Sequence, residues 1–349
     1  MKSLLYLANN IIRSNFSRMN YPFKLTFIVT NQCNLRCKMC NIWSKNGSEP
    51  ELTTGEIERI LKRNDFFSWV NISGGEIFLR PDIVDIIKTV LATNKNLYLL
   101  DFPTNGFMTD TILQSVSKIL KYRPERLMIT VSLDGPLELH NELRGSRESW
   151  QRVVETFTDL RKLGEKNRNM HVYFGFTIMP QNMKMLNDAF LAVKSRVPDI
   201  THDDFHINIA HDSEHYYENK DQGFCAESEA LEYLRDFVKH RRFSLHPTYV
   251  LERKYQKLCS DYFHNKKIPM VCKALSSSCF LDPYGNVFPC SIYDKKIGNL
   301  KEYNFDIKKL WNSEMAIQVQ KEIEHGNCPQ CWTPCEAYQT LLDNLRSWW

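Results

Sequence analysis

Hydrophobic residues follow two patterns that alternate along the chain, one typical of strands and the other of helices. Short runs rich in β-branched and aromatic residues predict strands, and these lie at Lys24–Thr30, Trp69–Ser73, Leu97–Phe102, Arg126–Ser132, Met170–Ile178 and Asp204–Ala210. The segments between them carry apolar residues at helical spacing, at Thr54–Lys62, Ile83–Ala92, Ile112–Lys121 and Trp150–Leu163. Strand–helix alternation at this interval predicts βαβ units and a parallel sheet. Six such units are too few for a closed eight-unit barrel, so the sequence predicts an α/β fold with a partial (β/α)6 barrel or an open sheet.

After residue 210 the pattern changes. Residues 211–223 are polar and rich in His, Asp and Glu, which predicts a loop, and Glu227–Arg242 is then predicted to be a helix. From Val271 onward, short strands, Gly turns and cysteines predict a small metal-bound domain. The predicted organisation is an amphipathic helix over residues 1–23, the partial barrel over 24–225, a helical linker over 226–270 and a cysteine-rich domain over 271–349.

The first residues also show helical spacing, with basic residues between the apolar ones. The apolar positions are Leu4, Leu5, Leu7, Ile11 and Ile12. This pattern favours an amphipathic helix packed on the protein's own surface, and peripheral membrane docking is the less favoured alternative. Asn9 and Asn10 interrupt the apolar stretch and no small-residue cleavage site follows, so a signal peptide is not expected. The chain has no run of about 18 apolar residues, so no bilayer-spanning helix is expected either.

Composition narrows the class of protein. The 349 residues are 43% hydrophobic and 25% charged, as in ordinary globular proteins, and a net charge of +4 does not predict nucleic-acid binding. Eleven cysteines are many for such a chain. They fall in tight groups rather than in the pattern of a short secreted domain, which favours metal centres over disulfides. A reducing compartment is therefore expected, with the cytoplasm as the default.

The first cysteine group follows directly on the first predicted strand, as Cys33-x3-Cys37-x2-Cys40. Parallel sheets place their functional loops at the carboxyl ends of strands. Three thiolates can hold one corner of an iron–sulfur cluster, and they leave one iron free to bind a substrate directly. The alternative is a zinc knuckle with a distant fourth ligand, for which this spacing is uncommon.

This triplet closely resembles the signature of the radical S-adenosylmethionine (SAM) superfamily, in which it lies in the loop after the first strand. Membership would imply a [4Fe–4S] cluster held by Cys33, Cys37 and Cys40, with SAM bound at the open iron. The residue before the third cysteine is usually aromatic in that family, whereas this chain has Met39, whose soft apolar side chain can pack against adenine.

Two further segments resemble the family's SAM-binding loops. Ser73-Gly74-Gly75-Glu76 ends the second strand, and the resemblance implies that it holds the amino group of SAM. Its two glycines allow close approach of the backbone to a ligand, and its carboxylate can accept hydrogen bonds from a cation. Position 77 is Ile where the family usually has Pro. Thr104-Asn105-Gly106 follows the third strand and resembles the family's loop near the cofactor.

The fourth strand ends in Ser132-Leu133-Asp134-Gly135, and Arg144 follows. By the same resemblance, Ser132 and Asp134 face the ribose of SAM and Arg144 pairs with its carboxylate, for which a guanidinium is well suited. A surface ion pair is the alternative for Arg144. Ile178, near the end of the fifth strand, would be an adenine contact by resemblance, or else a core residue.

The carboxyl-terminal cysteines form the patterns Cys272-x12-Gly285-x4-Cys290 and Cys328-x2-Cys331-x3-Cys335, with a hairpin turn predicted at Asp282–Asn286. They resemble the SPASM or shorter twitch domain, which binds auxiliary clusters. The full SPASM run Cys-x2-Cys-x5-Cys-x3-Cys is absent, so one auxiliary [4Fe–4S] cluster is preferred to two.

The preferred ligands of that cluster are Cys272, Cys290, Cys328 and Cys331. Cys335 competes for the last place, and Cys279 could belong to a second, incomplete site. A zinc ribbon is the alternative, because paired cysteine hairpins also suit tetrahedral zinc. Cys225 and Cys259 have no partners by spacing and are expected to be inert thiols.

The resemblance implies reductive cleavage of SAM to a 5′-deoxyadenosyl radical, followed by hydrogen abstraction from a C–H bond. The substrate would be a peptide or a small polar, sugar-like molecule, and the electron donor a flavodoxin or ferredoxin. A group of histidines and tyrosines near the barrel mouth could bind that substrate or lie in a solvated loop: His202, His206, His211, His215, Tyr216 and Tyr217. The alternative function is a non-catalytic iron–sulfur or zinc protein that carries electrons or serves as a scaffold.

Overall fold

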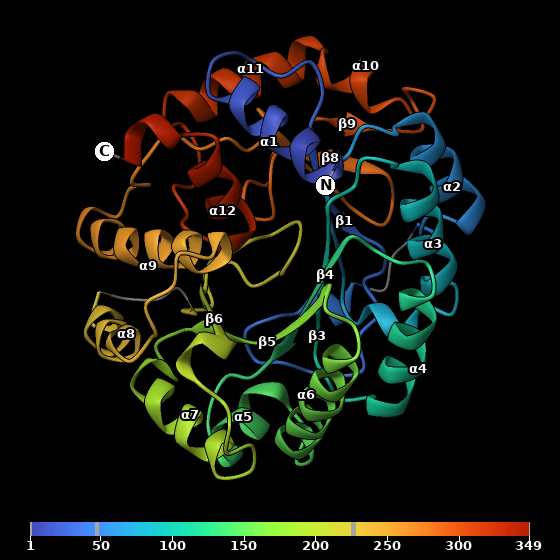
Figure 1. Ribbon diagram of the computed structural model, residues 1–349. Helices are drawn as coiled ribbons and strands as arrows, with labels where there is room; N and C mark the ends of the chain where they lie inside the picture. The colour runs from blue at the N-terminus through green and yellow to red at the C-terminus, as the bar shows by residue number, and fades with distance from the viewer. Residues whose placement is uncertain (1, 46–48, 225–227, 349) are drawn as a thin grey trace.

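A computed structural model describes residues 2–45, 49–224 and 228–348 (Figure 1). One nine-stranded sheet runs through the molecule in the order β6-β5-β4-β3-β2-β1-β7-β8-β9. The strands are β1 Lys24–Ile28, β2 Trp69–Ser73, β3 Leu99–Thr104, β4 Arg126–Ser132, β5 Met170–Ile178, β6 Phe205–Ile209, β7 Ser278–Leu281, β8 Asn286–Phe288 and β9 Gly298–Asn299. Strands β1 to β6 pair in parallel in chain order, which confirms the predicted partial barrel.

Helices connect successive strands and cover the outer face of the sheet (Figure 1). They are α2 Thr54–Arg63, α3 Ile83–Thr93, α4 Thr109–Leu120, α5 Leu137–Arg144, α6 Ser149–Glu165 and α7 Leu186–Lys194. The start of α2 shows how the sequence sets these bounds. The Thr53 hydroxyl accepts a hydrogen bond from the Glu56 amide, and the Glu56 carboxylate accepts one from the Thr53 amide, which is a complete capping box.

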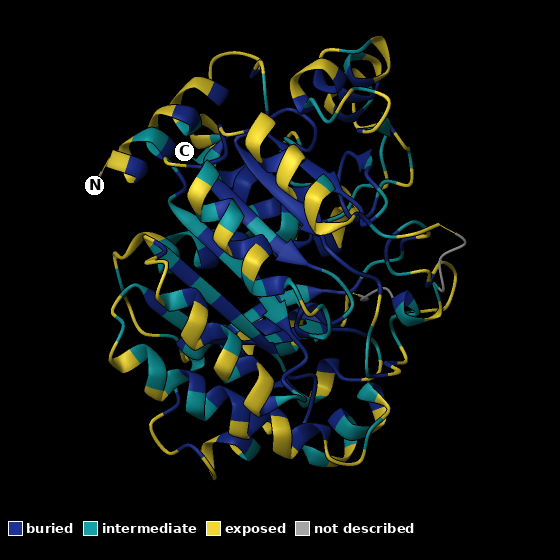
Figure 2. Ribbon diagram, turned by 90° about the vertical axis from the view of Figure 1, so that its right-hand side faces the viewer, coloured by how far each residue is buried: buried dark blue, intermediate teal, exposed yellow. Residues whose placement is uncertain are grey.

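The two faces of the curved sheet differ in character. Along β4, buried residues alternate with half-buried ones, and the same alternation is visible on the strands in Figure 2. The buried set, such as Leu127, Ile129 and Val131, packs into the main hydrophobic core under the helices. The half-buried set therefore points to the concave side, since successive side chains of a strand face opposite ways.

The carboxyl-terminal region is continuous with the barrel sheet. β7 pairs with β1 in parallel, with Lys24 opposite Ser278, and β8 and β9 follow as an antiparallel meander. The remaining helices are α8 Ala230–Lys239, α9 Pro247–Asn265, α10 Ile307–Trp311, α11 Glu314–Glu324 and α12 Pro334–Leu342. Helix α12 contacts both α9 and β6, so α9 and α12 occupy the gap between the β6 edge and the β7–β9 end of the sheet (Figure 1).

Most predicted elements match the structure closely. β2, β4 and β5 have the predicted bounds, whereas β3 begins two residues later because Leu97 belongs to a turn closed by its amide on the Asn94 carbonyl. The helix predicted at Glu227–Arg242 is the shorter α8, and Glu227 lies outside the described residues, as does Cys225.

The first helix, α1 Lys2–Ser14, forms as predicted and buries only some of its apolar residues. Its buried residues are mostly small and polar, whereas Leu5 and Ile12 are exposed. The reason is polar docking: the Asn10 amide contacts the Ser68 hydroxyl, and the Ser14 hydroxyl donates to Asp343. Leu7 is also buried, in a cluster with Met19 and Phe23 against which Ile11 packs, so the helix lies on the protein's own surface while part of its apolar face stays exposed. Among the described residues, no helix has the length and apolar character needed to cross a membrane.

Candidate active site

The three clustered cysteines lie in the loop after β1, at the carboxyl end of the sheet. Cys37 is buried, and Cys33 and Cys40 pack against a small apolar cluster that includes Ile28 and Tyr216. None of the ten cysteines within the described ranges forms a disulfide. The loop therefore presents free thiols at the edge where parallel sheets place their ligands.

Burial dominates the electrostatics of these thiols. It raises the pKa of Cys33 and Cys37, and it raises the pKa of Cys40 to about 12. Cys37 also raises the pKa of Cys33, both raise the pKa of Cys40, and Asp134 raises the pKa of Cys37, whereas Arg144 lowers the pKa of all three thiols. Iron would supply the positive charge that three buried thiolates need, so the donor set fits a cluster.

The geometry also bears on the zinc alternative. Within the described part of the chain, no three His, Cys, Asp or Glu side chains gather closely enough to hold a single metal ion. A tetrahedral zinc ion needs its ligands within about 2.3 Å of one centre. Cysteines of an iron–sulfur cluster each bind a different iron and so stand farther apart. The arrangement favours a cluster over a zinc knuckle.

The Gly74-Gly75-Glu76 loop packs directly on the cysteine loop. The Gly75 amide donates to the Thr30 carbonyl at 2.8 Å, and the Glu76 amide donates to the Gln32 carbonyl at 2.8 Å. A Cβ atom at Gly75 would lie 2.1 Å from the Gln32 oxygen, and one at Gly74 would lie 2.5 Å from the Thr30 oxygen. The sequence explained both glycines by approach to a ligand, but the structure shows that contact between the two loops already requires them.

Glu76 is fully buried and holds the next loop in place. Its carboxylate accepts hydrogen bonds from the Thr104 hydroxyl at 3.0 Å and from the Asn105 amide at 2.7 Å. Burial nevertheless raises its pKa to about 7. No described cation forms an ion pair with this carboxylate, whose Oε1 atom also accepts from the Phe78 amide at 3.4 Å. The Asn105 side chain in turn lies 3.8 Å from the Cys33 sulfur.

Arg144 forms a buried ion pair with Asp134. Its Nε and Nη2 atoms lie 2.7 and 2.5 Å from the same carboxylate oxygen, and its Nη1 lies 3.8 Å from the Cys37 sulfur. Burial would lower the pKa of Arg144, but Asp134 outweighs it and raises the pKa. The other Asp134 oxygen accepts from the Thr177 amide at 3.0 Å. The surface ion pair considered for Arg144 is therefore wrong, because Asp134 is fully enclosed.

The remaining predicted cofactor contacts separate into two kinds. Ser132 is half-buried on the concave face, and Met39 packs against Leu143 and Met179 near the end of β5. Ile178 belongs to the main core on the helix-covered face, where it is 1% exposed. Its role as an adenine contact is not supported, because its side chain has the strand register of Phe174, which faces the helices.

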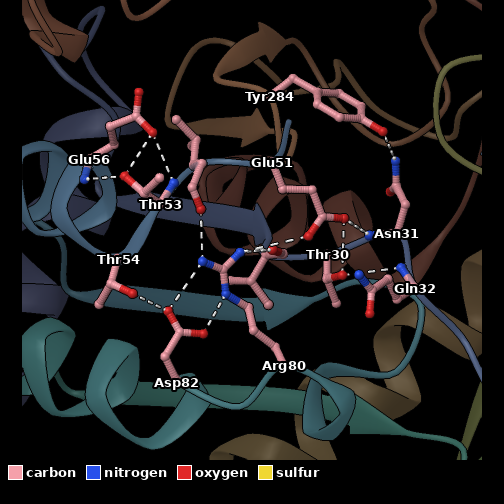
Figure 3. A network of polar contacts seen from close by, with 12 residues as sticks. Thr30, Asn31, Gln32, Glu51, Thr53, Thr54, Glu56, Arg80, Asp82 and Tyr284 are labelled. Carbon is pink, nitrogen blue, oxygen red and sulfur yellow. Dashed lines mark hydrogen bonds and ion pairs between the residues drawn. The ribbon is translucent and has the colours of Figure 1, made fainter. Parts of the chain in front are cut away.

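A polar network that the sequence did not reveal fixes the start of the cysteine loop (Figure 3). Glu51 accepts hydrogen bonds from the Asn31 amide at 2.7 Å and from the Thr30 hydroxyl at 3.0 Å. Arg80 lies 3.8 Å from Glu51 and donates to neighbouring carbonyls, and the Asn31 side chain donates to the Tyr284 hydroxyl at 3.1 Å. Tyr284 belongs to the β7–β8 turn, so the carboxyl-terminal region contacts the loop that carries Cys33.

The carboxyl-terminal cysteines divide into a group and two outliers. Burial raises the pKa of each, and mutual repulsion adds to this within the set Cys272, Cys290, Cys328 and Cys331. Cys335 instead interacts with Lys24, Glu336 and Asp101, and Cys279 interacts with Glu336. Electrostatic interactions thus link the four preferred ligands to one another, whereas Cys335 and Cys279 share with three of them only the neighbouring Glu336.

Residues 211–219 form a packed bridge rather than a solvated loop. The Tyr216 hydroxyl lies 3.0 Å from the Ser73 hydroxyl, beside the Gly-Gly-Glu loop. The Asn219 amide donates to the Met39 carbonyl at 2.9 Å, and His211 accepts from the Trp332 amide at 3.3 Å. One segment therefore contacts the cysteine loop, the second-strand loop and the carboxyl-terminal cysteine region.

The concave face of the sheet is polar and half-buried. Its described residues include Asn71, Asp101, Thr130, Ser132, Thr177, His206 and Asn208. Its two cations, Lys24 and Arg126, start their strands and so lie at the end of the sheet away from the cysteines. Toward the cysteine loop this face carries the side chains of Ser132, Thr177 and Asn208, and the Arg144–Asp134 ion pair lies beside the loop itself.

Two family models match the sequence at the regions just described. Residues 27–192 match the radical SAM superfamily, and residues 272–336 match the SPASM domain, an iron–sulfur cluster-binding domain. The first match contains the cysteine triplet and the loops at the ends of β2 to β4. The second contains the four grouped cysteines together with Cys279 and Cys335.

Curated relatives span most of the chain. The subtilosin biosynthesis protein AlbA of Bacillus subtilis is 25% identical over 94% of this chain and 71% of its own length. An AdoMet-dependent heme synthase of Oleidesulfovibrio alaskensis is 25% identical over 87% of this chain and 78% of its own. The mycofactocin maturase MftC of Mycolicibacterium smegmatis is 23% identical over 90% and 76%.

Solved structures share the fold at low identity. Streptococcus suis SuiB aligns with a TM-score of 0.60 at 16% identity, over 91% of this chain and 71% of SuiB. The enzyme anSMEcpe with bound AdoMet aligns with a TM-score of 0.59 at 16% identity, over 93% of this chain and 98% of anSMEcpe. These matches establish the arrangement of a partial barrel with a carboxyl-terminal extension.

Proposed function

The chain belongs to the radical SAM superfamily and carries a carboxyl-terminal SPASM domain, and from this we propose that it modifies a C–H bond of a peptide. Bound to the cluster, SAM supplies a 5′-deoxyadenosyl radical that can take a hydrogen atom from carbon. The protein's part is to hold the cofactors, orient the substrate and exclude water.

The proposed roles follow from the contacts of each residue. Cys33, Cys37 and Cys40 would ligate the cluster, because their buried thiols need compensating positive charge. The Gly74-Gly75-Glu76 loop would hold the amino group of SAM, as the resemblance to the family's motif implies, with Glu76 fixing the loop through its hydrogen bonds to Thr104 and Asn105. Arg144, fixed by Asp134, would keep its outer edge available for the SAM carboxylate.

Ser132, on the concave face, would contact the ribose, and Met39 the adenine. Thr104 and Asn105 would act indirectly, by holding Glu76 and the loop that carries Cys33. Asp134 would position Arg144 rather than touch the ribose, because both of its oxygens already accept hydrogen bonds from the protein.

The observation that carries the peptide proposal is the neutral polar lining of the concave face. Thr130, Ser132, Thr177 and Asn208 offer donors and acceptors without charge, which suits peptide amides and uncharged side chains. Beside the cysteine loop, Arg144 is already paired with Asp134, and Lys24 and Arg126 lie at the opposite end of this face. A substrate bearing several phosphates or carboxylates therefore fits this lining less well. A small sugar-like molecule is the second candidate, because hydroxyl groups also suit this lining.

The names of similar proteins point in the same direction. AlbA is a bacteriocin biosynthesis protein, MftC is a maturase, and one SuiB structure contains the precursor peptide SuiA. We propose that the substrate here is likewise a precursor peptide.

The four grouped cysteines would hold one auxiliary [4Fe–4S] cluster, able to take up the electron released when a substrate radical is oxidised. A flavodoxin or ferredoxin would supply electrons to the first cluster. A reducing compartment such as the cytoplasm would keep these thiols free.

Anaerobic reconstitution with iron, sulfide, reductant and SAM tests the proposal. The wild-type protein should release 5′-deoxyadenosine, and Cys33→Ala should abolish the release while Cys259→Ala, a buried core thiol, should retain it. Short peptides encoded beside the gene should change mass only with the wild-type enzyme. Production of 5′-deoxyadenosine by Cys33→Ala would contradict the radical SAM site, and turnover of sugars but not peptides would contradict the substrate.

A further inference from the structure

Helix α1 presents its large apolar side chains to solvent. Leu5, Ile12 and Phe16 are 65%, 56% and 67% exposed, and Leu4 beside them is 44% exposed. Positions 5, 12 and 16 are spaced by seven and four residues, which places them on one side of a helix that continues into the following turn. Figure 2 shows α1 beside the N label, with exposed positions alternating with buried ones. A stripe of this kind costs free energy in water unless something covers it.

A second exposed apolar pair lies in the connection between α8 and α9. Phe243 and Leu245 are 81% and 79% exposed. Arg241 donates to the carbonyl of Phe205, the first residue of β6, which places this connection at the amino end of the sheet. Helix α1 lies at the same end, because Asn10 contacts Ser68, the residue before β2.

Cation–π contacts link the two apolar regions through the end of the chain. The Arg253 guanidinium lies over the Phe243 ring at 5.2 Å, and Lys254 on the same helix lies over Trp348 at 5.6 Å. Arg346 lies over the Phe16 ring at 4.0 Å. We call this continuous surface the basal band: residues 2–18, 239–249 and 345–348, with Arg253 and Lys254.

The basal band is basic as well as apolar. Its three segments contain no Asp or Glu, although the whole chain has 41 of these residues. The exposed Lys and Arg residues of these segments are Lys2, Arg13, Arg18, Lys239, Arg242 and Arg346, whereas the Arg241 side chain is buried beside Glu252. Long apolar side chains interleaved with cations suit a surface that has an anionic outer layer and a hydrocarbon interior.

We propose that the basal band binds the surface of an anionic lipid membrane, with α1 lying in the plane of the headgroups. The cations would contact lipid phosphates while Leu5, Ile12, Phe16 and Phe243 enter the acyl boundary. A second copy of this chain fits less well, because a two-fold contact through the band would oppose its cations to one another.

The orientation is compatible with catalysis. The band lies at the amino ends of the strands, whereas the cysteine loop and the Gly-Gly-Glu loop follow their carboxyl ends. A membrane at the band would therefore leave the mouth of the barrel open to a substrate. This inference does not depend on the peptide proposal, because it rests on surface residues remote from the site.

Co-sedimentation of the full-length protein with vesicles tests the proposal. Wild type should bind phosphatidylcholine vesicles containing phosphatidylserine and should bind pure phosphatidylcholine vesicles much less. The variant Ile12→Glu/Phe16→Glu should bind at least roughly tenfold more weakly, since two apolar anchors are lost. Leu191→Glu is the matched control, because Leu191 is 59% exposed on α7, outside the band.

The variants should keep the wild-type circular dichroism spectrum and the wild-type yield of 5′-deoxyadenosine per cluster. Raising the salt to about 0.5 M should weaken binding to the anionic vesicles by screening the cations. Absence of wild-type binding, or equal loss in Leu191→Glu, would overturn the proposal. A concentration-dependent dimer that Ile12→Glu/Phe16→Glu dissociates would assign the band to a second copy instead.

Discussion

Replacement of Arg144 by Met removes the cation that faces Asp134 while keeping a long side chain of similar reach. Asp134 is fully enclosed, and only 13% of the Arg144 side chain is exposed, so water cannot take over the role of the guanidinium. The change leaves a buried carboxylate whose one remaining hydrogen-bond donor is the backbone amide of Thr177. It also removes the positive group beside the Cys37 sulfur.

The expected cost follows from this burial. Loss of one partner of a buried ion pair destabilises a protein by about 3–5 kcal/mol, because the other charge remains desolvated. Asp134→Asn should cost less, since Asn still offers an oxygen to the Thr177 amide. The double variant Arg144→Met/Asp134→Asn should recover about 2 kcal/mol relative to the sum of the single changes, because no unpaired charge remains.

The wild type, the two single variants and the double variant form a double-mutant cycle. Urea unfolding of the cluster-free proteins under reductant, followed by circular dichroism, gives the free energy of unfolding of each. Arg161→Met is a suitable control, since that arginine pairs with Asp199, which is 71% exposed. The control should change the free energy of unfolding by less than about 1 kcal/mol. A coupling free energy below about 0.5 kcal/mol between Arg144 and Asp134 would refute the reasoning.

Three other predictions test the site. Gly75→Ala should destabilise by about 3 kcal/mol in thermal unfolding, because its Cβ would overlap a carbonyl oxygen, whereas Gly55→Ala, with open space around it on α2, should be neutral or stabilising. Glu76 has a pKa raised to about 7, so the wild type should lose about 2 kcal/mol of stability relative to Glu76→Gln as pH rises from about 5 to 7; parallel pH curves in urea unfolding would contradict this. Cys331→Ser should lower the iron content by about four atoms per chain, whereas Cys335→Ser should not. Equal losses of iron in the two variants would show that Cys335 is also a ligand of the auxiliary cluster.

The sequence predicted the barrel well because its signals are local. Strand and helix periodicity fixed β2, β4 and β5, and the order of the loops identified the cysteine and Gly-Gly-Glu segments. It misjudged Gly75, because a glycine looks the same whether it admits a ligand or a neighbouring backbone. The structure showed that the Gln32 carbonyl occupies that space.

Other features leave no local trace in the sequence. Glu51 and Arg80 are ordinary charged residues, and they meet the start of the cysteine loop only through the folding together of segments that follow β1 and β2. The orientation of α1 could not be predicted from helical periodicity either. Periodicity defines an apolar face of a helix, but it does not show which face packs against the protein. Here the polar partners Ser68 and Asp343 decided it.

The position of β1 makes the two cysteine-bearing regions inseparable. β1 is hydrogen-bonded to β2 on one side and to β7 on the other, so a chain ending before residue 271 would expose one backbone edge of the strand that leads into Cys33. Unpaired edges of this kind promote aggregation. Exchange of carboxyl-terminal regions between related enzymes must therefore preserve the fit of β7 to β1 as well as the cysteine spacing. Lineages would then inherit the two regions as one unit, and substrate range would diverge through loops instead.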